Sequence, residues 1–165
     1  MKCALHIHQN LFWACNNGKT AEAKRLIAEG APVDWQDVDG CTPLHGASVY
    51  GHTEIVMLLL ENKCDAKITD KKGNPPLIWA ARNNNMDTVR ALVEAGCDIT
   101  IRGGKNKTAA EWAKQIGHHA TEEYLANEAP RVQVRSTHRA RAAPWPTRPM
   151  PLFSYCAYCP SRLVF

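Results

Sequence analysis

The sequence predicts an all-α solenoid of stacked helix-turn-helix units, followed by a C-terminal tail without regular structure. First, residues 39–69 match residues 72–102 when the chain is shifted by 33 positions. Second, each copy holds two helical signals separated by a polar turn. Third, the periodicity stops after residue 128, where the composition changes. A period of this length is typical of an array in which no single unit buries its own apolar face.

Four copies of the repeat fill residues 1–128, as units of about 5–37, 38–70, 71–103 and 104–128. The terminal copies match less well, as expected where one face of a unit meets water. All four share an alanine whose small side chain suits close packing between helices: Ala14, Ala47, Ala80 and Ala113.

The helix starts differ between the units. In the second unit, Thr42 can cap the free N–H groups of a helix and Pro43 suits its first position. The third unit has Pro75 in place of the threonine, which predicts a weaker start. In the fourth unit, Thr108 and Glu111 have the spacing of a capping box.

The second unit reads Asp39-Gly40-Cys41-Thr42-Pro43-Leu44-His45, and continues through Ala47 to Gly51-His52-Thr53-Glu54-Ile55-Val56. This phrase, together with its partial copies, resembles the ankyrin repeat. The resemblance implies helix-turn-helix units joined by projecting β-turn fingers and curved into a solenoid. It also implies structural roles for His45, His52 and His118.

The resemblance to ankyrin repeats also implies that partners contact the finger tips and the inner face of the first helix of each unit. Transfer of these positions by register gives the candidate partner-binding residues: Asn16, Asn17, Trp35, Gln36, Val38, Asp39, Cys41, Val49, Tyr50, Thr69, Lys71, Lys72, Asn74, Arg82, Asn83, Arg102 and Lys105.

Two of these candidates, Trp35 and Tyr50, are large aromatic residues where the repeat does not require one, and such residues are enriched in binding hot spots. For Trp35 the alternative is packing against a neighbouring finger. Trp79 and Trp112 are expected to pack between units. The candidate charges change from acidic near Asp39 to basic in the later units, which would orient a partner of opposite polarity.

The basic character of the chain belongs to its tail. Residues 1–128 hold 14 Lys/Arg and 16 Asp/Glu, a net charge of −2, whereas residues 129–165 hold 6 Arg and no acid, which together give the overall +4. The proline-rich tail is expected to be disordered. Its arginines offer an alternative function, binding of nucleic acid or of another anionic surface. Its apolar end, residues 151–165, could instead dock on the array or bind a partner.

No combination of residues predicts catalysis, a cofactor or a bound metal. The odd number of cysteines, seven, and the repeat spacing of Cys64 and Cys97 favour free thiols in a reducing, intracellular compartment. Cys156 and Cys159 form a Cys-x-x-Cys pair without a second pair of zinc ligands nearby. No apolar run is long enough to span a bilayer. We therefore predict a non-enzymatic, monomeric interaction module that binds another protein through finger tips and a concave face.

Overall fold

The computed structural model describes residues 4–128 of the chain, and the described residues form helices and turns without strands. The helices are α1 (Ala4–Asn16), α2 (Thr20–Ala28), α3 (Pro43–Tyr50), α4 (Thr53–Glu61), α5 (Pro76–Arg82), α6 (Met86–Glu94) and α7 (Ala109–Ile116). A last helical segment covers residues 119–128. The predicted all-α class is confirmed. The tail, with its expected disorder, its arginines and its Cys-x-x-Cys pair, lies outside the described residues.

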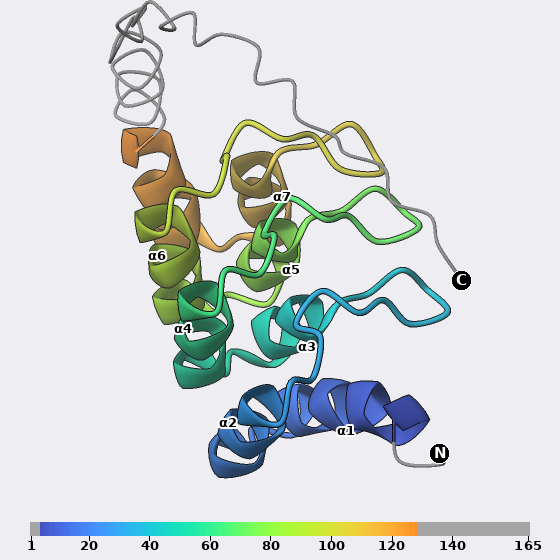
Figure 1. Ribbon diagram of the computed structural model, residues 1–165. Helices are drawn as coiled ribbons and strands as arrows, with labels where there is room; N and C mark the ends of the chain where they lie inside the picture. The colour runs from blue at the N-terminus through green and yellow to red at the C-terminus, as the bar shows by residue number, and fades with distance from the viewer. Residues whose placement is uncertain (1–3, 129–165) are drawn as a thin grey trace, which may run out of the picture.

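The helices form two columns that run along the solenoid. Figure 1 shows α1, α3, α5 and α7 in one column, α2, α4 and α6 in the other, and the loops between units projecting to one side as fingers. Within each column a helix packs against its counterpart in the next unit, and within each unit the two helices pack together. Each unit therefore buries its apolar faces mainly against its neighbours, as the repeat predicted.

The core between the two columns continues through all the units. The four repeat alanines are fully buried, which confirms the close helix packing expected of them. The largest fully buried apolar side chains of the core include Leu11, Leu44, Ile55, Leu59, Ile78, Leu92 and Leu125. Burial of each such side chain contributes about 1.5–3 kcal/mol. Within residues 4–128 no helix is long and apolar enough to cross a membrane.

Helix starts follow the caps predicted from the sequence. The Thr42 hydroxyl accepts a hydrogen bond from the His45 N–H, and the His45 ring accepts one from the Thr42 N–H at 3.1 Å. At α7, the Thr108 hydroxyl accepts from the Glu111 N–H while the Glu111 carboxylate accepts from the Thr108 N–H. Pro75 caps α5 without any side-chain hydrogen bond, so the third unit lacks this stabilisation.

A row of side chains at the turns between paired helices ties each unit to the preceding one. His52 Nε2 lies 3.2 Å from the Asn16 carbonyl oxygen, and His118 Nε2 lies 3.1 Å from that of Arg82. In the third unit Asn85 takes the histidine position, and its Nδ2 donates to the carbonyl oxygens of α3. These contacts meet carbonyls near helix ends, which have no partner within their own helix. The structural role implied for the histidines is confirmed.

Candidate functional site

The turns of the fingers are stabilised by hydrogen bonds to aspartate side chains and by residues in the left-handed backbone conformation. Asp37 Oδ1 accepts from the N–H groups of Asp39 and Cys41 at 2.8 Å. The tips of the first two fingers turn at Gly40 and Gly73, which have φ values of 77° and 76°. Such angles are readily adopted only by glycine and by small polar residues, and the corresponding position of the last finger is an asparagine.

Asn74 links the last two fingers. Its Nδ2 lies 3.3 Å from Asp70 Oδ2, its Oδ1 accepts from the Gly104 N–H at 3.2 Å, and its carbonyl oxygen lies 3.1 Å from His45 Nε2. The residue is 4% exposed. Its side chain therefore acts mainly as a structural clamp between the fingers, with little of its surface exposed.

A pocket of about 500 Å³ lies between the second and third of these fingers and the helices behind them. Five of the sequence-predicted candidates come together in its lining, together with Gly104 and Trp112: Lys71, Lys72, Asn74, Arg82 and Lys105. No carboxylate side chain belongs to this lining. The pocket is thus a hollow with four cationic side chains and one indole ring.

Aromatic rings contact two of the four cations of this pocket, Arg82 and Lys105. The Arg82 guanidinium carbon lies 4.6 Å from the ring centroids of both Trp79 and Trp112. Lys105 Nζ is 5.5 Å from the Trp112 centroid, and Lys107 Nζ is 5.3 Å from it. Each such cation–π contact contributes about 0.5–1 kcal/mol or more when water is excluded. Arg82, Lys105 and Lys107 therefore lie around the ring of Trp112.

The two tryptophans also have structural roles. Trp112 is only 7% exposed, as expected for packing between units. Trp79 is half-buried, and its Nε1 donates to Asp70 Oδ2 at 3.0 Å. Burial disfavours the charged form of Asp70, but hydrogen bonds from Asn74, Trp79 and Lys72 outweigh it and lower the pKa of this carboxyl. A buried anion thereby anchors the finger next to the pocket.

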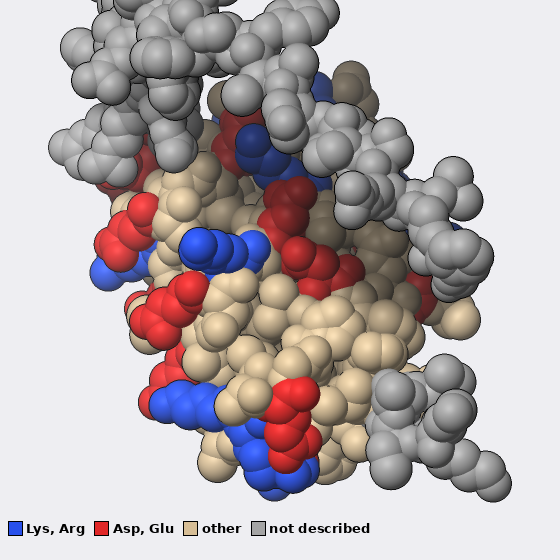
Figure 2. All heavy atoms as spheres, in the orientation of Figure 1, with Lys and Arg blue, Asp and Glu red and all other residues tan. Residues whose placement is uncertain are grey.

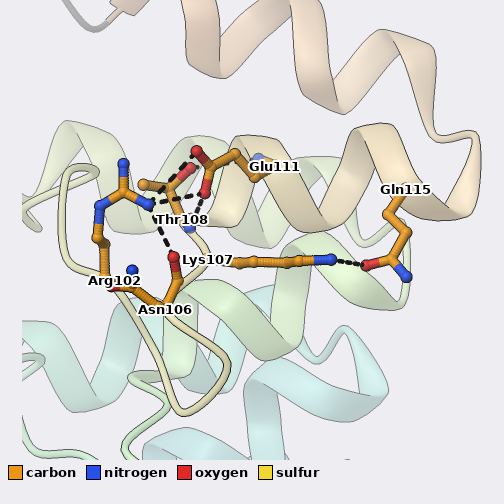
Figure 3. A network of polar contacts seen from close by, with 6 residues as sticks. All are labelled: Arg102, Asn106, Lys107, Thr108, Glu111 and Gln115. Atoms are coloured by element: carbon orange, nitrogen blue, oxygen red, sulfur yellow. Dashed lines mark hydrogen bonds and ion pairs between the residues drawn. The ribbon is translucent and has the colours of Figure 1, made fainter.

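Arg102 is engaged inside its own unit. Figure 3 shows its guanidinium reaching the Asn106 carbonyl oxygen and the Glu111 carboxylate, next to the Thr108 cap. The Arg102–Glu111 separation is 3.2 Å, and both side chains are exposed. The same view shows Lys107 directed at Gln115. Arg102 thus braces the start of α7, beside the pocket but outside its lining.

Trp35 packs on its own unit. Its ring stacks on that of His8, with centroids 6.4 Å apart, and meets the edge of Phe12 at 5.9 Å. Trp35 therefore contacts α1 and not a neighbouring finger, the packing alternative considered from the sequence. Tyr50 is 62% exposed and Val38 is 82% exposed, so these two present apolar surface to solvent.

The remaining candidates divide by exposure. Half-buried are Asn16, Cys41 and Val49; exposed are Asn17, Gln36, Asp39, Thr69 and Asn83. Trp112 is missing from the sequence-predicted candidates, because a tryptophan in the first helix of a unit is typical of core packing. A signal was present: Trp112 occupies the position of Trp79 one repeat later, next to a cluster of lysines.

The described residues hold no cluster of metal-binding side chains. Among them, no three His, Cys, Asp or Glu side chains gather in a way that could hold an ion. Burial raises the pKa of Cys15 and Cys64 to about 12 and that of Cys97 to about 11, so these free thiols stay protonated at neutral pH. They behave as small apolar side chains, as the repeat spacing indicated.

The fold and the finger geometry define a protein of the repeat-solenoid class. The model of the family described as "Ankyrin repeats (3 copies)" matches residues 11–103. The chain belongs to the ankyrin repeat family, whose members generally act as protein–protein interaction modules.

The matches to curated relatives cover less than half of this chain. Protein phosphatase 1 regulatory subunit 12A of Mus musculus is 39% identical over 70 residues, which are 42% of this chain and 6% of that protein. Ankyrin repeat-containing protein P1E11.10 of Schizosaccharomyces pombe is 33% identical over 64 residues, 39% of this chain and 31% of the relative. Palmitoyltransferase AKR1 of Lachancea kluyveri is 38% identical over 64 residues, 38% of this chain and 9% of the relative. In these three cases the chain spans less than a third of the relative's length.

Proposed function

We propose that this chain is a non-catalytic intracellular module whose array, residues 1–128, binds a polypeptide segment of another protein as a monomer. The contact surface consists of the finger tips and the adjoining face of the first helices. The observation that supports this most directly is the pocket, where Lys71, Lys72, Arg82 and Lys105 converge from two fingers and one helix. Concave sites with a few convergent polar groups are the usual places for recognition.

Exposed apolar side chains on the earlier units extend the proposed surface. Val38 lies at a finger tip and Tyr50 at the end of α3, and both are more exposed than is usual for large apolar residues. Aromatic residues in such positions supply contact area at a low entropy cost. A segment that crosses several units would contact the apolar side chains on the second unit and the basic pocket on the later units.

The charge along the second helices does not suggest a second interface there. Figure 2 shows acidic and basic side chains interspersed along the edge that carries the second helices. Among them, Arg25 is paired with Glu22 and Glu29 on α2. Such exposed pairs compensate each other's charge and contribute little binding or stability.

Affinity capture from a native lysate tests the proposal with three baits. They are the full chain, the full chain with Val38→Ser and Tyr50→Ser, and a control with Met57→Ser. Met57 is an exposed apolar residue of α4 in the other column, so it matches the chemistry of the change but not its place. A protein lost by the double variant and kept by the control supports the proposal. A protein kept by all three, and lost when the tail arginines are changed to glutamine, favours the tail alternative.

A further inference from the structure

The cations of the pocket lack the acidic partners that several other cations of the array have. Lys71, Lys72, Arg82 and Lys105 form no ion pair with any carboxylate among the described residues. By contrast, Arg102 is paired with Glu111 at 3.2 Å, and Lys114 with Glu122 at 3.5 Å. The pocket therefore gathers uncompensated positive charge on an array whose net charge is −2, from 14 basic and 16 acidic residues.

The acid next to the pocket, Asp70, forms no ion pair with these cations among the described residues. Asp70 is 7% exposed, and its two oxygens accept from the Lys72 and Asn74 N–H groups and from the Trp79 ring at 2.8–3.0 Å. These donors surround the carboxylate on the side of its own finger. The lysine ammonium groups are left to water or to a ligand.

Arg82 is fixed in position but keeps its donors available. Its guanidinium lies over two indole rings, and no described acceptor binds its nitrogens. A guanidinium carries five N–H donors in a planar fork that matches a carboxylate. Because the rings restrain the side chain before a ligand arrives, less conformational entropy is lost on binding.

We infer that this pocket binds acidic side chains of a partner's polypeptide, with Arg82 as the central donor and Lys72 and Lys105 on either side. The inference rests on the proposed function and specifies its partner as a segment rich in aspartate or glutamate. Charge-assisted hydrogen bonds from these groups to carboxylates would be stronger than those between neutral groups.

Charge distribution favours a peptide over other anionic or internal occupants. The chain's own tail holds six arginines and no acid, so it would be repelled from the pocket. A nucleic acid is uniformly anionic and would meet Asp37 and Asp39 on the first finger of the same side of the array. A peptide can be acidic at one end only, and so fits both parts of the surface.

Selection from a displayed library of short random peptides tests the inference with the full chain. The peptides recovered are sequenced, and the most enriched acidic peptide is synthesised with a fluorescent label. A second version of it has glutamine and asparagine in place of the acids. Binding of both, and of a mixed-sequence single-stranded DNA, is measured by fluorescence anisotropy at low salt.

The variants change the same charge in different places. The pocket variant carries Lys72→Gln and Lys105→Gln, two exposed side chains whose loss should leave the fold intact. The control variant carries Lys24→Gln and Lys63→Gln, an exposed lysine of α2 and one of the turn that follows α4. A tail control carries Arg139→Gln and Arg141→Gln. Arg82→Gln is added, with circular dichroism to check its folding.

We expect acidic peptides to be enriched and the pocket variant to bind about tenfold more weakly, with both controls within about twofold of the original chain. Enriched peptides that are not acidic, bind the pocket variant normally and are lost with Tyr50→Ser would overturn the inference and keep the proposed function. Recovery of no peptide would argue against both. Loss of acidic-peptide binding only in the tail control, or tighter binding of the DNA than of the peptide, would also overturn the inference.

Discussion

Replacing Asn85 by alanine should lower the free energy of unfolding by about 2 kcal/mol. The Asn85 Nδ2 donates to the carbonyl oxygens of Ser48 and Val49, each at 2.9 Å. Both carbonyls lie in the last turn of α3 and belong to the preceding unit. A hydrogen bond of this kind contributes about 1 kcal/mol net, and two are lost together. The change therefore weakens the interface between the second and third units.

Two further substitutions at this position separate the hydrogen bonds from simple loss of volume. His52 and His118 occupy the same repeat position and each make one ring contact with a carbonyl, so Asn85→His should cost only about 1 kcal/mol. Asn85→Asp removes the donor and places a carboxylate oxygen near two carbonyl oxygens. It should cost more than alanine at neutral pH.

Urea unfolding followed by circular dichroism gives the free energies. Asn62→Ala is the matched control, since the Asn62 side chain donates only to Leu58 within its own exposed helix end. Its expected cost is about 0.5 kcal/mol or less. The reasoning is refuted if Asn85→Ala is as stable as the control, or if the aspartate variant is as stable as the histidine variant.

Three other outcomes follow from the caps and the buried titratable groups. Thr42→Ala should lower the free energy of unfolding by about 1–2 kcal/mol and Thr108→Ala by about 1 kcal/mol. The difference arises because Thr42 is 1% exposed, so water cannot replace its hydrogen bonds. Equal losses for the two variants in urea unfolding would contradict this. Burial lowers the pKa of His45, so the unfolded chain takes up the proton first as the pH falls, and stability decreases below the ordinary pKa of about 6.5 until the lowered folded pKa is passed. A His45→Gln variant should lose part of this dependence, and an unchanged profile would argue against the assignment. Finally, iodoacetamide should modify three buried thiols only after unfolding, those of Cys15, Cys64 and Cys97. Rapid labelling of these three cysteines in the native protein, detected by mass spectrometry, would disprove this prediction.

The repeat register predicted much of the fold because each unit is shaped by local signals. Thr42, Thr108 and Glu111 form their caps within four residues of sequence, so the sequence pattern contains all the partners. Pro75 was predicted to lack a cap for the same reason.

The site was harder to predict because its contacts join neighbouring units. Asn74 occupies the repeat position of the half-buried Cys41, yet it is buried because the Gly104 N–H of the next finger meets its side chain. The contact between Arg82 and Trp112 joins residues one unit apart. Register alone gives the position of each residue but not which side chain of the next unit reaches it.

The hydrogen bonds that join the units have a consequence for folding kinetics. Those made by His45, His52, Asn85 and His118 to neighbouring units connect residues 29 to 37 positions apart. Since loop closure over such distances is inexpensive in entropy, a pair of adjacent units can form before the rest of the chain is available. Growth can then proceed unit by unit in either direction, and during synthesis the first units can fold while the last are still being made.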